Sequence, residues 1–313
     1  MEAPLQTDDD RRTLGIAAVS ATTVVWSLVP LILKSTDMPG LTFAMYRLWL
    51  GVLVYAVVFA IRRQRLSGAT IRACALGGVF FAADIGLTFS AFSLTSAANA
   101  TIIGALSPVL IALAAARWFG ERIERRDLVL VAASFGGVVV VAAASQGSDV
   151  ATPLGDLCAA LSVISWTAYW LFSKRSRVTT TALEYIATVM LVAAITITPF
   201  TIGFGALTGM SLAPPSGRDW LLIWVVTLIP GATGHLLVAW SHEHVEAWLS
   251  ALITQSQPVI ASIAAWIVLG EVLTPLAIAG GVVVIGATAV IVARGARRTP
   301  GPVDVELAPE RAT

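Results

Sequence analysis

The chain has 313 residues, of which 57% are hydrophobic and only 12% are charged, and its formal net charge is +1. A mean hydropathy of +0.83 excludes an ordinary soluble domain, in which roughly a quarter of the residues are charged. We therefore expect an integral membrane protein.

Ten apolar runs follow one another along the chain, each close to the roughly 20 residues that a helix needs to cross the hydrocarbon core. They lack the alternation of strands, so an all-α integral membrane fold is predicted. The runs cover residues 14–34, 40–61, 73–93, 97–118, 127–145, 153–173, 182–205, 219–241, 247–269 and 274–293. Residues 1–13 and 299–313 are predicted to be cytoplasmic tails, the second disordered, and the first run is expected to be a retained anchor.

Basic residues are distributed unevenly about these runs. All 20 Lys and Arg residues flank the same set of loops, except Lys34, Arg218 and Arg47. Positive-inside logic places both termini in the cytoplasm, and the excess of Arg over Lys points to a bacterial inner membrane. Because orientation explains the basic residues, we expect no nucleic-acid partner.

The two halves of the chain share one plan. Residues 108–121 recur as 258–271 with Pro, Val, two Ala, Gly and Glu at identical places, and residues 14–34 match 154–174. The duplication predicts two five-helix repeats, 14–145 and 153–293. Because five is odd, the second repeat must cross the membrane upside down relative to the first.

The duplicated block contains elements that interrupt helices. Pro108 and Pro258 fall in the middle of the fourth and ninth spans, where each should kink its helix. The kinks are interpreted as matched hinges, with static kinks that only shape packing as the alternative. Gly120 and Gly270 are expected to end these spans in the left-handed conformation, and the Glu after each Gly is expected to be structural.

Ten spans in two halves, with a Pro-x11-Gly-Glu ending on spans four and nine, resemble the EamA-type drug/metabolite transporter superfamily. The resemblance covers roughly residues 14–293, and the run 239–250 is also similar to members. It implies that spans one to four and six to nine surround a central cavity, with spans five and ten as peripheral supports. It also implies export or uptake of small metabolites by alternating access, without an ATP-binding domain.

Three ionisable residues, Arg47, Asp84 and His235, lie within spans. Because burial of such groups in a membrane costs free energy, they are the best candidates for functional residues. Arg47 and Asp84 both sit roughly 10–14 Å below the outer surface. They fit either a structural ion pair or a substrate clamp, with Arg for a carboxylate and Asp for an ammonium group or a proton. Asp84 and His235 are proton-coupling candidates, although helix packing explains His235 equally well. His242 and His244 are expected in a solvated loop.

Two polar or aromatic faces complete the predicted site. Span six carries Ser162, Trp166, Tyr169, Trp170 and Ser173 on one helical side, which suggests a cavity wall or an interfacial belt. In span nine, four polar residues at 254–257 directly precede the proline, whereas the equivalent 104–107 is less polar. The predicted substrate-binding residues are Trp26, Arg47, Asp84, Asn99, Trp166, Tyr169, Trp170, Gln255 and Gln257.

The leading functional hypothesis is a secondary transporter, an exporter or exchanger, of a small polar or amphipathic metabolite such as an amino acid. The alternative is an integral-membrane enzyme acting on lipid-linked substrates, which usually needs clustered carboxylates or His. We expect no catalytic residue, no metal site and no cofactor. Small residues at four-residue spacing in span five, including Ala133 and Gly137, fit either a homodimer face or an intramolecular contact.

Overall fold

The computed structural model describes residues 8–33, 35–121, 123–144, 152–270 and 273–295, and all regular structure in these ranges is helical. Ten helical segments of the described chain are long and apolar enough to cross a membrane, five in each half. The expected all-α fold of two five-helix repeats is therefore confirmed. The predicted C-terminal tail at 299–313 lies outside the described residues.

The first half contains seven helices because two of its spans are interrupted. Span one is α1 and α2, span four is α5 and α6, and the other spans are single helices. The bounds are α1 Asp8–Ser27, α2 Val29–Leu33, α3 Gly40–Ile61, α4 Gly68–Leu94, α5 Ala97–Gly104, α6 Ser107–Phe119 and α7 Arg125–Ala144. Helix α1 begins within the predicted tail 1–13, where Arg12 is buried against the bundle.

The second half repeats this plan with a different interruption. Span eight is α10, η1 and α11, and span nine is α12 and α13. The bounds are α8 Pro153–Ser176, α9 Ala182–Thr208, α10 Gly217–Val226, η1 Thr227–Gly234, α11 His235–Ser241, α12 Ala247–Thr254, α13 Gln257–Leu269 and α14 Pro275–Gly295.

Spans four and nine break at equivalent positions. Residues 105–106 separate α5 from α6, and residues 255–256 separate α12 from α13. Pro108 and Pro258 are each the second residue of the helix after the break, because a proline cannot continue the hydrogen-bond ladder of the preceding turn. The predicted kinks are thus two-residue turns, whose backbone stays in the right-handed helical region. Gly120 (φ 63°) and Gly270 (φ 70°) end α6 and α13 in the left-handed region, as predicted.

Span eight contains a π-helix, η1, that the sequence analysis did not predict. Its wider turns loosen the regular ladder around Pro230, and π segments often occur at functional sites. Side chains of the first half bind its carbonyl oxygens: Trp26 Nε1 donates to Pro230 O at 2.8 Å, and the Tyr55 hydroxyl donates to Ala232 O at 2.8 Å. The two halves are therefore joined where η1 leads into α11.

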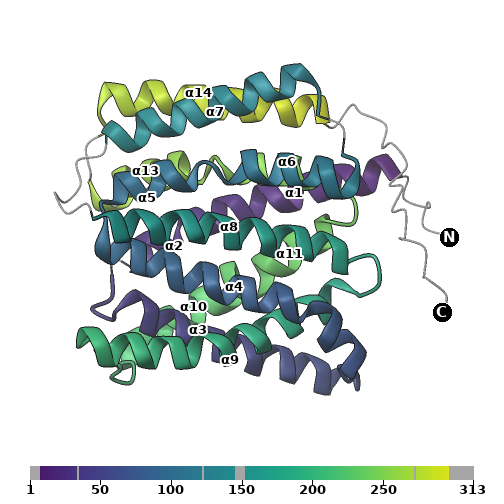
Figure 1. Ribbon diagram of the computed structural model, residues 1–313, viewed down its shortest axis with the longest axis vertical. Coiled ribbons are helices and arrows are strands. Elements are labelled where there is room, and N and C mark those ends of the chain that lie inside the picture. The colour runs from purple at the N-terminus through teal and green to yellow at the C-terminus, as the bar shows by residue number, and fades with distance from the viewer. Residues whose placement is uncertain (1–7, 34, 122, 145–151, 271–272, 296–313) are drawn as a thin grey trace.

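Helices α7 and α14 pack together along one edge of the bundle, and α3 and α9 lie at the opposite edge (Figure 1). The first pair is close: a Cβ on Gly137 would lie 2.8 Å from the carbonyl oxygen of Gly280, whereas one on Gly136 would meet nothing within 4 Å. Gly137 therefore serves an intramolecular contact, and the homodimer stays a prediction. Spans five and ten lie together at the edge of the bundle, as the resemblance implied for peripheral supports, although span five also reaches the cavity described below.

Candidate functional site

A cavity of about 420 Å³ lies between the two halves of the bundle. Its described lining residues come from spans one to six, eight and nine, with Val138 of α7 among them. Span seven contributes none of them, because α9 packs behind α3 and α4 at the bundle edge (Figure 1). The implied basket is corrected accordingly: span seven is not part of the cavity wall, and span five touches it.

Arg47 of α3 and Asp84 of α4 both line this cavity and are half-buried. Among the described residues, no carboxylate oxygen lies within 4.0 Å of an Arg47 nitrogen. Asp84 accepts one long hydrogen bond, from Thr88 Oγ1 at 3.4 Å. No ion pair within 4.0 Å joins the two side chains, so two groups of opposite charge face one cavity without touching each other.

His235, the first residue of α11, also lines the cavity. Its Nδ1 lies 3.0 Å from the hydroxyl of Tyr169. Its ring lies 4.7 Å from both the Trp26 and the Phe81 rings, centroid to centroid. The imidazole is therefore fixed on three sides by aromatic groups. Phe81 is a lining residue that the sequence analysis missed, because nothing distinguishes one Phe from others in an apolar span.

The predicted aromatic face divides into two parts. Trp26 and Trp166 line the cavity with their ring centroids 5.9 Å apart in an edge-to-face arrangement. Tyr169 and Trp170 are fully buried outside the lining: Tyr169 lies behind His235, and Trp170 Nε1 donates to Ala247 O at 3.1 Å. Only the first pair is placed to meet a ligand directly.

The polar segment of span nine surrounds the helix break. Thr254, Gln255 and Gln257 line the cavity. Gln255 Nε2 donates to Ala105 O at 3.1 Å, which connects the breaks of spans nine and four. Ser256 turns back to Ile253 O.

Asn99 lies away from the cavity lining, at the end of the bundle where α5 begins. Its Nδ2 donates to Asp156 Oδ1 at 3.2 Å, and Thr95 Oγ1 donates to the same oxygen at 2.7 Å. Asn99 therefore ties α5 to the first turn of α8. The structure gives it a contact that positions helices, at a distance from the charged groups of the cavity.

A network of ion pairs lies at the end of the bundle where α1 begins. Glu121 is nearly buried: its carboxylate pairs with Lys174 Nζ at 2.8 Å and accepts hydrogen bonds from the backbone N–H groups of Ala247 (3.0 Å) and Trp248 (3.4 Å). Arg12 pairs with Glu246, just before α12, at 2.7 Å. We call Arg12, Glu121, Lys174, Arg177, Glu243 and Glu246 the end network.

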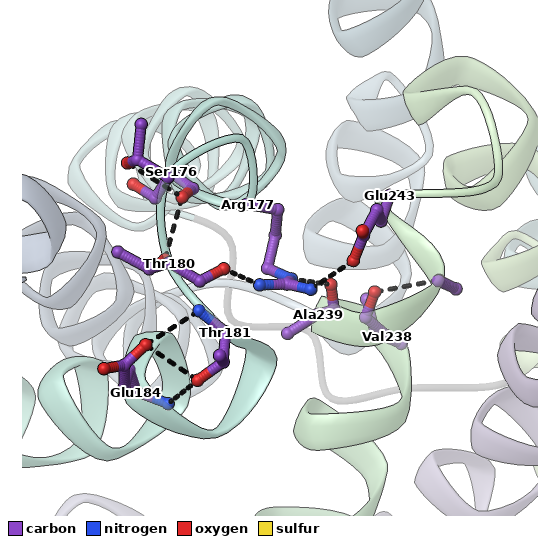
Figure 2. A network of polar contacts seen from close by, with 10 residues as sticks. Ser176, Arg177, Thr180, Thr181, Glu184, Val238, Ala239 and Glu243 are labelled. Atoms are coloured by element: carbon purple, nitrogen blue, oxygen red, sulfur yellow. Dashed lines mark hydrogen bonds and ion pairs between the residues drawn. The ribbon is translucent and has the colours of Figure 1, made fainter.

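Figure 2 shows Arg177, which joins the loop after α8 to the segment after α11. Its Nε donates to Ala239 O at 3.0 Å, its Nη1 to Thr180 O, and its Nη2 pairs with Glu243 at 2.5 Å. Burial lowers the pKa of Arg177, and Glu243 opposes that shift. The guanidinium thus holds two loops together by three groups.

His242 corrects the expectation of a solvated loop, because its side chain is only 2% exposed. Its Nδ1 lies 2.8 Å from Ser173 Oγ, and the Trp170 ring packs edge-on against it. Burial, and then the positive charges of Lys174 and Arg177, hold the pKa of His242 well below its usual value. His242 is thus a neutral part of the packing beside the end network.

Comparisons with known proteins agree with this architecture. The model of the EamA-like transporter family matches residues 13–143 and 153–293. A solved structure titled "Crystal structure of protein" superposes with a TM-score of 0.77 at 20% identity, covering 90% of this chain and 98% of that one. No curated protein matches the chain. At this identity the structural likeness speaks for the fold alone.

Proposed function

As a member of the EamA-like transporter family, the chain is a membrane transporter, and we propose that it exports or exchanges a small zwitterionic metabolite, such as an amino acid. The observation that carries the proposal is the placement of Arg47 and Asp84 on one cavity without an ion pair between them. The proposed transport is secondary, in line with what the resemblance to this family implies.

Charges at membrane depth are costly unless something compensates them. A ligand with a carboxylate and an ammonium group compensates both at once, with its carboxylate on Arg47 and its ammonium on Asp84. The rings of Trp26 and Trp166 supply an apolar wall for the rest of the molecule. Such a mixture of apolar wall and few convergent polar groups is typical of small-molecule sites.

Alternating access is supported by the contrast between the two ends of the bundle. The cavity reaches residues such as Phe92 and Ala100, which lie far from the start of α1. The opposite end is held by the end network, which positive-inside logic places at the cytoplasmic face of the inner membrane. We therefore assign an outward-facing arrangement, in which the breaks before Pro108 and Pro258 act as hinges of the two inverted halves.

The enzyme alternative gains no support from any of these observations. In the part of the chain that the structure describes, no group of three or more His, Cys, Asp or Glu is arranged to hold a metal ion. Asp84 and Arg47 are single charges on different helices, and neither is close to a second group of its own kind among the cavity-lining residues.

The test uses purified protein in liposomes loaded with an unlabelled mixture of the common L-amino acids. Labelled amino acids are added outside, and exchange is measured for wild type, Arg47→Met, Asp84→Asn and the double variant. Each single change should slow exchange roughly 100-fold, since it leaves one ligand charge unpaired. Glu124→Gln, at an exposed ion pair with Arg294 directly before the peripheral helix α7, is the matched control. Recovery of exchange in the double variant would mean that the two charges compensate only each other.

A further inference from the structure

We propose that Tyr169 holds His235 as the neutral tautomer with its proton on Nε2, and that this N–H donates a hydrogen bond to the substrate's carboxylate. His235 is then a specificity-determining residue and does not carry a transported proton. The substrate part of this inference rests on the proposed function. The tautomer itself depends only on the apo protein.

The argument begins with the hydroxyl proton of Tyr169. This side chain is only 1% exposed, and among the described residues its hydroxyl forms no hydrogen bond other than the one with His235 Nδ1, at 3.0 Å. If the hydroxyl accepted a hydrogen bond from an Nδ1–H group, its own proton would be buried without an acceptor. The free energy of folding would then bear the full desolvation cost of that O–H group. The hydroxyl therefore donates, and Nδ1 accepts.

A neutral imidazole whose Nδ1 accepts must carry its proton on Nε2. Tyr169 takes Nδ1 from outside the cavity lining, whereas His235 itself lines the cavity. No described residue forms a hydrogen bond with Nε2. The rings of Trp26 and Phe81 prevent the imidazole from turning. The polar group that His235 offers to a ligand is therefore a fixed N–H donor.

The groups that face His235 decide whether it accepts a second proton. Arg47 of α3 places a positive charge in the same cavity, which disfavours a positively charged imidazole. A proton on Nδ1 would also end the hydrogen bond that the Tyr169 hydroxyl donates to this nitrogen. Asp84 of α4 shares the cavity and, with the neighbouring rings of Trp26 and Phe81, favours a cation. Asp84 nevertheless makes no ion pair with the imidazole. The aromatic rings around the imidazole offer no hydrogen bonds in place of those that an imidazolium would make to water. The neutral form is favoured.

These donors require a substrate with a hydrogen-bond acceptor, such as a carboxylate, at one end. Arg47 and His235 supply donors from opposite halves of the chain, so a carboxylate between them contacts both repeats at once. Of the two groups considered for proton coupling, only Asp84 remains, because a fixed neutral donor cannot exchange a proton during the cycle. Ligands that lack a carboxylate should be rejected.

Nitrogen NMR of protein labelled with ¹⁵N-histidine, in lipid bilayers and without ligand, tests the tautomer. The chain has only three His residues, so the His235→Gln spectrum assigns the signals by difference. We expect Nε2–H with unprotonated Nδ1, unchanged from about pH 5 to pH 8. Tyr169→Phe should mix the tautomers. Tyr185→Phe should not, because the Tyr185 hydroxyl binds the backbone oxygen of Tyr169 and forms no described hydrogen bond or ring contact with His235. A proton on Nδ1, or titration in this range, would overturn the proposal.

The exchange assay described above tests the donor role separately. His235→Gln keeps an N–H donor and should stay within about threefold of wild type, while His235→Leu should lose roughly tenfold or more. Equal exchange by His235→Leu would refute the donor role. Adding the amino-acid mixture to the NMR sample should shift the Nε2 signal, and an unmoved signal in protein that exchanges amino acids would also refute it. If wild type exchanges none of them, the proposed function fails while the ligand-free spectra still decide the tautomer.

Discussion

Glu121 offers the sharpest test of how the cavity is closed at the end where α1 begins, which we propose faces the cytoplasm. Glu121 connects three spans. The residue follows the end of span four, and its carboxylate pairs with Lys174 of span six and accepts hydrogen bonds from the first amides of span nine. A cavity that opens to the cytoplasm must separate these groups. Replacing Glu121 with Ala should therefore shift the protein from the closed arrangement toward the open one.

The magnitude follows from burial. The side chains of Glu121 and Lys174 are 7% and 10% exposed, and removing one partner of a buried pair costs about 3–5 kcal/mol. Lys174 keeps a hydrogen bond to Val245 O at 3.0 Å, and it regains water when the end opens. We therefore expect the closed arrangement to lose about 2 kcal/mol relative to the open one, roughly a 30-fold change in the equilibrium.

A single cysteine reports the opening. Ser250 is fully buried on α12, between the amides that Glu121 caps and the cavity-lining Ala251. In protein with Cys74 and Cys158 replaced by Ala, the Ser250→Cys thiol should react slowly with a membrane-impermeant maleimide in inside-out vesicles. Adding Glu121→Ala should accelerate labelling about 30-fold if opening limits the reaction.

The controls separate opening from general loosening. Glu121→Gln keeps an acceptor for the Ala247 amide but removes the charge, so it should fall between wild type and Glu121→Ala. Glu124→Ala removes an exposed ion pair with Arg294 of α14, three residues after Glu121, and should not change the labelling measurably. Unchanged labelling in Glu121→Ala, with the protein folded, would show that the end network does not hold the closed arrangement.

Three further predictions concern stability, measured by thermal unfolding in detergent. Tyr55→Phe removes the hydroxyl that binds the π-helix and should lower the free energy of unfolding by about 1–3 kcal/mol, because the Ala232 carbonyl is left unpaired. An unchanged unfolding transition would argue against that hydrogen bond. His242→Gln should flatten the acid side of the stability curve. Because the pKa of His242 is lowered in the folded protein, its contribution to stability is fully present above about pH 6.5. That contribution is lost as the pH falls toward the folded pKa, by up to about 1.4 kcal/mol per pH unit. Identical pH slopes in variant and wild type would contradict this. Gly137→Ala should destabilise the α7–α14 contact, whereas Gly136→Ala, which meets open space, should not; equal effects would mean that the contact is not close.

The sequence predicted what depends on short spacing. Apolar length set the ten spans, Pro108 and Pro258 marked where spans four and nine are interrupted, and a glycine before a glutamate marked where each ends. These features are local, because a missing N–H group or a left-handed residue acts within one helical turn. The π-helix carried a comparable signal, Pro230 followed by glycine, but a proline alone does not distinguish a kink from an added residue per turn.

The candidate site could be predicted only in part, because its contacts join residues far apart in the chain. Glu121 binds the amide of Ala247, 126 residues later, and no spacing rule connects them. The burial of His242 depends likewise on Ser173, on another span. The sequence left Arg47 and Asp84 as either a pair or a clamp, since two charges at equal depth fit both until their side-chain directions are known.

The divergence between the repeats explains why equivalent positions have different roles. Ala105 and Gln255 are separated by 150 residues, the offset of the duplicated block, and they meet in space through the Gln255 Nε2 bond to Ala105 O. A symmetric pair of glutamines would place two amides where one carbonyl now accepts, and a pair of alanines would leave that carbonyl unbonded. One small and one polar residue satisfy the contact. The polar lining of span nine belongs to the second half, whereas Arg47 and Asp84 belong to the first. A ligand that bound both sets would contact both repeats, and its affinity would then differ between two arrangements of the halves, which is what shifts an equilibrium between them.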